Sequence, residues 1–352
     1  MACFIASGPL VDTCCAATVC PLHSTMRIVA LSYWPFRYET TSYDVCQIPR
    51  RSILSDTHSL KGVVVPVITP LGDDETVDET AFRAQIDRLI DAGVGGLFVG
   101  GSAGEGPLHT ETEWRRMIEI AGVAVDGRVP LLGGVADTST RRVVDKIERI
   151  AATGAYQFFV PTPTFYLANS CAAEHLRLHE TCWQHRGGME MIAYNIPSCV
   201  GSALAPDTVV TMAANGWIRY CKESSGDRDT LLHYLNDGGP VGLQTLVGDE
   251  PLIVAGLIAG GVGFVPVLGN VVPELCVGIF DAVSRGDLAD AVERHARLMR
   301  IRDVLLLAGD CWLSGIKYAV STMGIGNGRI SSPLQPTGDQ HKEAIAAVLA
   351  EA

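Results

Sequence analysis

From residue 60 onward, short runs of apolar residues alternate with longer segments in which apolar residues recur at helical spacing. Runs that are apolar throughout are typical of strands buried on both faces, as in a parallel sheet covered by helices. The pattern predicts strands at 62–70, 95–99, 129–135, 156–161, 189–194, 217–222, 242–247 and 262–268, and helices at 78–91, 111–125, 139–152, 171–184, 206–214, 227–236, 250–259 and 271–285.

Eight strand–helix units follow one another with short connections, and that number predicts a closed barrel rather than an open sheet. The expected fold class is therefore α/β, a (β/α)8 TIM barrel spanning residues 59–285. The segment 286–352 shows no further strand pattern. It predicts three appended helices, which would cover the barrel or form an oligomer contact, at 288–308, 311–323 and 339–350.

Residues 1–58 lack this pattern. They are rich in Cys, Ser and Thr, contain no lysine, and show no sustained period. Their arginines are balanced by acidic residues, whereas transit peptides are poor in acids. We expect this segment to be an irregular, poorly ordered N-terminal extension without a catalytic role.

Composition narrows the functional classes. The 352 residues are 47% hydrophobic and 19% charged, which suits a globular protein with a sizeable core. A formal net charge of −12 argues against nucleic acid or an anionic membrane as partner. No apolar run reaches the roughly 18 residues that would suggest a membrane span. The 11 cysteines include no zinc-type pair, which indicates a reduced, cytoplasmic setting.

The active site of such a barrel lies at the carboxyl ends of its strands, so the residues that follow each run are the candidates for chemistry. Lys222 ends the sixth run, and Ile218, Tyr220 and Lys222 share one face of a strand because side chains alternate. Burial favours the neutral form of a lysine, and a neutral amine can attack a ketone to form a Schiff base. Taken alone, a lysine at a strand end more commonly reaches water.

Three other strand ends carry candidates. The glycine-rich turn 100–105 follows the second run, and its N–H groups with the Ser102 hydroxyl could hold a carboxylate, although a plain tight turn would look the same. Tyr194 follows the fifth run and could act as general acid and base, or simply cap the core. Asp249 and Glu250 follow the seventh run and could bind substrate hydroxyls or cap the next helix.

The conjunction of these groups is what points to a function. A 2-oxo acid such as pyruvate needs a cradle for its carboxylate, a lysine for its ketone and a phenol to move protons while the bond breaks. Two histidines four apart, His175 and His179, lack a third ligand, so no metal site is predicted.

Three motifs carry a resemblance to a known family. Gly-Gly-Ser-Ala-Gly-Glu at 100–105, Tyr-Asn-Ile-Pro at 194–197 and Lys-Glu-Ser-Ser-Gly-Asp at 222–227 resemble those of the dihydrodipicolinate synthase/N-acetylneuraminate lyase family, from about residue 60 to the end. The resemblance implies a homo-oligomer, dimer or tetramer, without metal or organic cofactor. It implies that Lys222 forms the Schiff base with pyruvate or another 2-oxo acid, and that Tyr194 is the proton shuttle.

The resemblance also implies a set of substrate-binding positions: Ser102, Ala103, Gly104, Glu105, Tyr166, Ser224, Asp249, Glu250 and Val267.

Departures from the family pattern bear on the substrate. Ala103 stands where a second cradle hydroxyl is usual, and Cys199 stands where the synthase branch carries an arginine for its aldehyde partner. The acidic pair Asp249 and Glu250 is similar to that of the lyases of sialic acid and 2-keto-3-deoxy sugar acids. Val267, however, falls near the position where a serine is expected after the eighth strand.

These features predict a lyase or aldolase that cleaves or forms a carbon–carbon bond of a 2-oxo acid through a lysine Schiff base. A 2-keto-3-deoxy sugar acid or an N-acetylneuraminate-like substrate is favoured. The alternatives are the dihydrodipicolinate synthase reaction, a Schiff-base dehydratase of a keto-deoxy sugar acid, and a non-catalytic paralogue that binds a 2-oxo acid.

Overall fold

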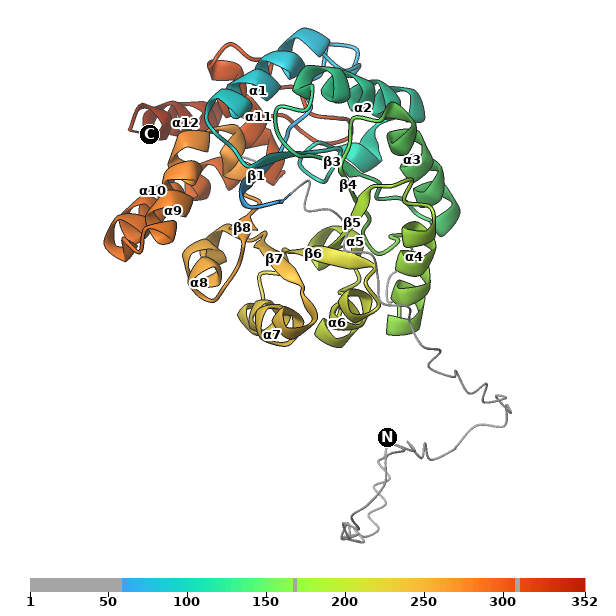
Figure 1. Ribbon diagram of the computed structural model, residues 1–352. Coiled ribbons are helices and arrows are strands. Elements are labelled where there is room, and N and C mark those ends of the chain that lie inside the picture. Colours follow the sequence, from blue (N-terminus) through green and yellow to red (C-terminus); the bar gives the residue numbers. More distant parts are fainter. Residues whose placement is uncertain (1–58, 167–169, 308–310, 352) are drawn as a thin grey trace, which may run out of the picture. The chain divides into compact units, whose positions relative to one another are not determined.

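Eight parallel strands close into a barrel in the computed structural model, which describes residues 59–166, 170–307 and 311–351 (Figure 1). Neighbouring strands pair in chain order, and β8 returns to β1 with Gly263 opposite Gly62. The predicted fold class is confirmed. The strands are β1 Gly62–Pro66, β2 Gly96–Val99, β3 Leu131–Gly134, β4 Phe158–Val160, β5 Glu190–Asn195, β6 Ile218–Glu223, β7 Gln244–Val247 and β8 Gly263–Phe264.

Helices surround the barrel, and several begin at capping residues that the sequence supplies. The side chains of Asp78, Thr110 and Asp227 accept the N–H of Ala81, Glu113 and Thr230 at the first turns of α1, α2 and α7. The helices are α1 Glu79–Asp91, α2 Glu111–Val125, α3 Thr140–Thr153, α4 Ala172–Gln184, α5 Pro197–Val200, α6 Pro206–Ala214, α7 Arg228–Gly238, α8 Ile253–Ile258, α9 Pro273–Ser284, α10 Leu288–Leu306, α11 Trp312–Thr322 and α12 Asp339–Ala350.

The last three helices, α10, α11 and α12, lie on the side of the barrel next to α9 and α1 (Figure 1). Within the described ranges, no helix is long and apolar enough to cross a membrane. Residues 1–58, expected to form an irregular extension, lie outside the residues that the structure describes.

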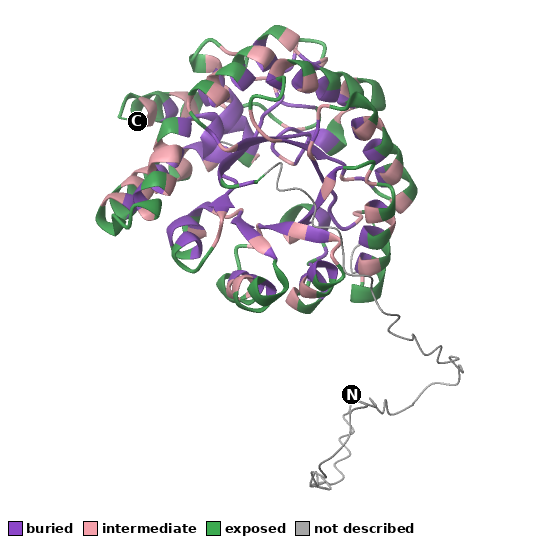
Figure 2. Cartoon of the chain, viewed as in Figure 1, coloured by how far each residue is buried: buried purple, intermediate pink, exposed green. Residues whose placement is uncertain are grey.

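Two apolar clusters divide the core, because side chains on a strand alternate between its faces. The smaller cluster fills the barrel and takes at least one residue from every strand except β8. The larger one lies between the strands and the helices, where Figure 2 shows the buried colour on the inward sides of the helices. The residues that the strands and the β8 end contribute to the inner cluster include Val64, Phe98, Leu132, Phe158, Ile192, Tyr220, Leu246 and Val265.

The beginning of β6 departs from simple alternation. The pairing register between β5 and β6 shifts after Met191, so that Met191 pairs with Ile218 but Ile192 pairs with Tyr220. Ile218 consequently belongs to the outer cluster, while Tyr220 belongs to the inner one. The prediction that Ile218 shares a face with Lys222 is therefore wrong, because a bulge inserts one extra residue into the strand.

The eighth strand is also shorter than the predicted 262–268. After β8 the chain forms a 3-10 turn, Val267–Asn270, in which the side chain of buried Asn270 replaces ladder hydrogen bonds. Its Oδ1 accepts the Ile68 N–H at 3.0 Å, and its Nδ2 donates to the Pro66 carbonyl at 2.9 Å. The Asn270 amide thus pairs the Ile68 N–H and the Pro66 carbonyl, two backbone groups that a longer β8 would have paired.

Candidate active site

Lys222 and Tyr194 face each other from adjacent strands. They are register partners on β6 and β5, and the lysine Nζ donates to the tyrosine hydroxyl at 2.9 Å. Lys222 is 5% exposed and Tyr194 3%, so neither group faces bulk solvent. The lysine Nζ also lies 5.3 Å from the ring centroid of Phe98, and the rings of Phe98 and Tyr194 meet in a T-shaped arrangement. The barrel interior therefore holds one amine and one phenol within hydrogen-bond distance.

The glycine-rich turn after β2 brings Ser102 to the same place. Its hydroxyl lies 3.4 Å from that of Tyr194. The turn bonds to itself through Glu105 N–H to the Ser102 carbonyl and Gly106 N–H to the Gly101 carbonyl. No protein acceptor for the N–H of Ser102 or Ala103 is found in the part of the chain that the structure describes. The turn therefore offers a hydroxyl and free N–H donors, the groups that bind a carboxylate.

Glycine is required where β3 meets this turn. A Cβ at Gly134 would lie 2.2 Å from the carbonyl oxygen of Gly100, which is closer than any side chain permits. Gly100 itself has φ of +72°, in the left-handed region that favours glycine. These two positions let the turn lie directly over the strand end.

A cavity of about 220 Å³ opens above these groups at the barrel mouth. Ser102, Tyr194 and Phe98 line its inner end. The Lys222 amine lies directly behind this wall, because it donates a hydrogen bond to the Tyr194 hydroxyl. The other lining residues come from the turn after β2, the ends of β3 and β4, and α5: Gly100, Gly101, Pro107, Leu108, Gly134, Ala136, Val160, Thr162, Phe165, Ile196, Cys199 and Val200.

A second polar layer lies behind β5 and β6. The neighbours of the catalytic candidates, Asn195 and Glu223, point to the opposite face and bond to each other at 3.0 Å, while Glu223 also accepts the Ser225 N–H. Burial raises the pKa of the Glu223 carboxyl. Asn195 in turn accepts the Leu204 N–H. This layer fixes the ends of the two strands that carry Tyr194 and Lys222, and the sequence pattern alone did not indicate it.

Glu105, predicted to bind substrate, has a different place. Its side chain is 1% exposed and forms an ion pair with Lys317 of α11 at 2.5 Å, while its second oxygen accepts the Ser331 N–H at 2.7 Å. Both carboxylate oxygens are thus engaged by the C-terminal region, and Glu105 does not line the cavity. Burial lowers the pKa of Lys317. We correct the assignment: Glu105 holds the turn from behind.

Removing one partner of this pair should be costly. In Lys317→Met the Glu105 carboxylate stays buried without its counter-charge, and we expect the free energy of unfolding to fall by about 3–5 kcal/mol. Urea unfolding followed by circular dichroism measures this loss. The double variant Glu105→Gln/Lys317→Met removes both charges and should recover part of it. Equal losses in the single and double variants would show that the pair is not what stabilises the turn.

The acidic pair after β7 also lies away from the cavity. Glu250 is buried and accepts the Val267 N–H at 2.9 Å, with Arg302 at 4.0 Å from its other oxygen. Burial raises the pKa of Glu250 and of Asp249. Asp249 lies beside Gly226, and neither carboxylate is part of the cavity wall. The prediction that this pair meets substrate hydroxyls finds no support, because Glu250 is committed to the loop after β8.

Three further predicted positions are placed as follows. Val267 is packed in the outer core and gives its N–H to Glu250, and the Ser224 hydroxyl packs against Gly248. Tyr166 is 87% exposed, and its predecessor Phe165 lines the cavity instead. Of the binding residues predicted, Ser102 lines the cavity, Ala103 and Gly104 belong to its turn, and the remainder lie outside it.

The cavity wall contains residues that the sequence did not single out. Thr162 and Phe165 come from the loop after β4, and Cys199 and Val200 from the short helix α5. The position of these residues directly after predicted strands is the signal that could have indicated them. Cys199 was noted only for the charge that it lacks; burial raises the pKa of its thiol.

Two buried histidines lie on the inner face of α4. His175 bonds to the Ser202 hydroxyl at 3.0 Å, and His179 bonds to the His175 carbonyl at 2.7 Å. Among the described residues, no group of three His, Cys, Asp or Glu side chains is placed to hold a metal ion. Burial lowers the pKa of His179 from 6.5 to about 4.

This shift makes stability depend on pH. Between about pH 6.5 and 4 the unfolded chain binds a proton at residue 179 that the folded protein excludes, so the free energy of unfolding falls as pH falls. We expect His179 to account for roughly 3 kcal/mol of the loss. Urea midpoints at pH 7 and pH 4.5 should differ less in His179→Leu than in the unmodified protein. His233→Gln, a change at an exposed histidine, serves as control. An equal difference in urea midpoint between pH 7 and pH 4.5 in all three proteins would contradict the assignment to His179.

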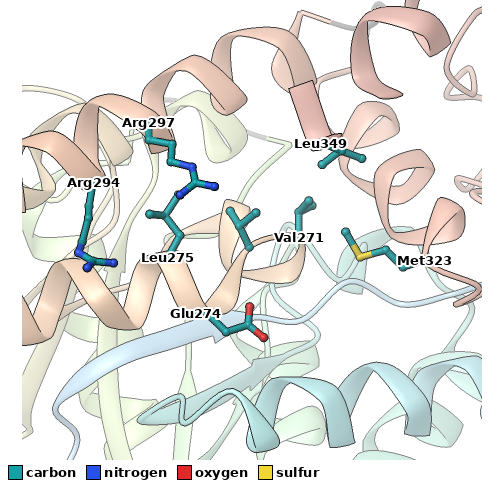
Figure 3. Close-up of a pocket in the computed structure, with 8 residues that line it drawn as sticks. Val271, Glu274, Leu275, Arg294, Arg297, Met323 and Leu349 are labelled. Atoms are coloured by element: carbon teal, nitrogen blue, oxygen red, sulfur yellow. The ribbon is translucent and has the colours of Figure 1, made fainter. Parts of the chain in front are cut away.

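A larger cavity of about 420 Å³ lies elsewhere, between the C-terminal helices (Figure 3). Glu274 and Leu275 of α9, Arg294 and Arg297 of α10, and Leu349 of α12 line it. Arg294 is paired with Asp290. None of the groups predicted for catalysis lies there, so its size does not make it the candidate active site.

Fold and site together define a β/α-barrel protein with a buried lysine at the carboxyl end of its strands. Residues 59–352 match the model of the dihydrodipicolinate synthetase family. The chain belongs to this family, whose members are lyases.

Relatives and solved structures agree with this. The chain is 33% identical to an uncharacterized DapA-like lyase of Halobacterium salinarum, over 84% of this chain and 95% of the relative. It is 31% identical to a 4-hydroxy-tetrahydrodipicolinate synthase of Methanopyrus kandleri, over 81% of this chain and 94% of that enzyme. The structure of YagE, a prophage protein of this family from E. coli K12 in complex with pyruvate, superposes with a TM-score of 0.77, 26% identity and coverage of 83% and 98%.

Proposed function

We propose that the protein is a Schiff-base lyase or aldolase acting on a 2-oxo acid of the pyruvate type. The observation that carries this proposal is the 2.9 Å contact between the Lys222 amine and the Tyr194 hydroxyl at the inner end of the cavity. A non-catalytic binder would have no use for a nucleophile and a proton shuttle in contact. The similarity to YagE, a relative solved with pyruvate, supports the same substrate class.

The first step is formation of the imine. The substrate carboxylate binds the Ser102 hydroxyl and the N–H groups of the turn, which places its ketone carbon toward Lys222. The amine adds to this carbon, and Tyr194, within hydrogen-bond distance of Nζ, protonates the departing hydroxyl so that water leaves. The resulting iminium accepts an electron pair from the neighbouring carbon.

The second step breaks the bond between C3 and C4 of a 4-hydroxy-2-oxo acid. Tyr194, now deprotonated, takes the proton of the C4 hydroxyl. The C4–O bond becomes the carbonyl of an aldehyde, and the electron pair of the C3–C4 bond moves into the iminium to give an enamine. Protonation at C3 and hydrolysis by water release pyruvate and free Lys222. The reverse sequence forms the bond.

The nature of the aldehyde partner separates the alternatives. Several relatives are named 4-hydroxy-tetrahydrodipicolinate synthase, but Cys199 in the cavity wall offers no positive charge to an anionic aldehyde. The sugar-acid alternative depended on Asp249 and Glu250, which lie outside the cavity. The 2-oxo acid end of the substrate is thus the part that the geometry supports best.

Reduction of the imine tests the proposal. Incubation with pyruvate and borohydride should attach a reduced pyruvate to the peptide that contains Lys222, which mass spectrometry detects. The chain has five lysines, so the site is resolved easily: Lys61, Lys146, Lys222, Lys317 and Lys342. Of the buried ones, Lys146 and Lys317 are paired with Asp137 and Glu105. No adduct, or an adduct on another lysine, would refute the Schiff-base mechanism.

A further inference from the structure

The outer part of the cavity is apolar. Beyond Ser102 and Tyr194 its wall consists of aliphatic and aromatic side chains and glycines, together with the thiol of Cys199 and the hydroxyl residue Thr162. Among its lining residues there is no Asp, Glu, Lys, Arg, His, Asn or Gln in the part of the chain that the structure describes. The apolar members are Ala136, Val160, Pro107, Leu108, Phe165, Ile196 and Val200.

Among the described residues of this wall, Thr162 carries the one further hydroxyl. Its side chain is 4% exposed, and no hydrogen-bond partner for its Oγ1 is found within the described residues. A buried hydroxyl without a partner is uncommon in a folded protein and calls for an explanation. Thr162 lines the cavity, so a molecule bound there lies next to this residue.

Such a wall discriminates between substrates. A chain with several hydroxyl groups would lose its hydrogen bonds to water in this cavity and find few replacements. An apolar chain or ring would gain by leaving water. The volume, about 220 Å³, corresponds to roughly seven water molecules, enough for a three-carbon acid and a short tail.

We propose that the second substrate is an apolar aldehyde, so that the full substrate is a 4-hydroxy-2-oxo acid with an aliphatic or aromatic group on C4. Thr162 binds the C4 oxygen, and the wall formed by Leu108, Phe165, Ile196 and Val200 takes the apolar group. This inference rests on the proposed function. The bonds that form and break are those of the Schiff-base cleavage described above.

The competing class is a hydroxyl-rich tail. A more polar depression lies beside the cavity and shares Phe165 with it; Thr138, Thr164, Ser170 and Glu174 contribute to its lining. A sugar-like tail would have to pass Phe165 to reach these groups. The experiment therefore compares the two kinds of tail directly.

The assay measures pyruvate consumption by the full chain with aldehydes of matched length: pentanal and benzaldehyde as apolar partners, ribose-type hydroxyl-rich aldehydes, and succinic semialdehyde as an anion. We expect kcat/KM for the apolar aldehydes to exceed that for the others by at least about tenfold. Borohydride trapping with pyruvate is run in parallel. Trapping without a preference for apolar aldehydes overturns this inference alone, whereas no trapping overturns the proposed function as well.

Two variants test the wall itself. Leu108→Asn adds a hydrogen-bonding group and should reduce the preference for apolar aldehydes about tenfold. Ile258→Asn makes the same kind of change at an exposed residue of α8 and should leave the preference unchanged. Thr162→Val should lower kcat/KM for every accepted aldehyde by about tenfold, with Thr162→Ser restoring it. If Leu108→Asn behaves as Ile258→Asn does, or Thr162→Val as the unmodified protein, the assignment of the wall is wrong.

Discussion

Lys222→Ala should lose at least about a thousandfold in kcat and yield no borohydride adduct with pyruvate. The Lys222 amine bonds to Tyr194 in the cavity wall, and no lysine is among the described residues that line the cavity. Without it the ketone is held but not activated. The measurement is pyruvate release from an accepted substrate, together with mass spectrometry of the reduced mixture.

Two controls separate chemistry from folding. Lys222→Arg places a guanidinium beside Tyr194 but cannot form an imine, so it should be as inactive as the alanine variant. Lys342→Ala removes an amine from the surface helix α12 and should keep full activity. Turnover by Lys222→Arg comparable to that of the unmodified protein would mean that the lysine acts through its charge and not as a nucleophile.

Tyr194→Phe should lower kcat by about 10²–10⁴-fold while still allowing some adduct to form. The ring, which forms a T-shaped pair with Phe98, is preserved, and only the hydroxyl 2.9 Å from the lysine amine is lost. Imine formation slows because water must leave without an acid, and bond cleavage slows because no base takes the C4 proton. Single-turnover measurements of adduct formation and of aldehyde release distinguish the two steps.

A matched control for this variant is Tyr234→Phe. The Tyr234 hydroxyl is also buried, but it donates to the Leu204 carbonyl behind the barrel. Its loss should reduce stability by about 1 kcal/mol and leave kcat unchanged. If both variants lose turnover equally, the effect of Tyr194→Phe comes from packing rather than from proton transfer.

The residues that the sequence placed correctly are those governed by local rules. Lys222 and Tyr194 end adjacent strands, and the closed barrel follows from eight repeated units, so their meeting could be predicted. Glu105 and Glu250 could not be placed in this way. Both are acidic residues after strands, but Lys317 follows Glu105 by 212 positions, and Val267 lies beyond the next strand, 17 positions after Glu250.

The cavity wall was unpredictable for a related reason. Thr162, Leu108 and Val200 are ordinary residues in loops and short turns, and only the closure of the barrel brings them together. The bulge in β6 was hidden as well, because the sequence there continues to look like a strand. The local sequence pattern predicts strands and helices, but it does not show which residue of another segment each side chain will contact.

The contacts of Glu105 affect when, during synthesis of the chain, the glycine-rich turn can reach its folded arrangement. Its partners Lys317 and Ser331 follow it by 212 and 226 positions along the chain. During translation, the early strands can emerge and begin to pair long before these partners exist. The glycine-rich turn therefore acquires the contacts that support it only when the ribosome has nearly finished. A polypeptide interrupted before residue 317 would carry Lys222 and Tyr194 but lack these contacts beside them.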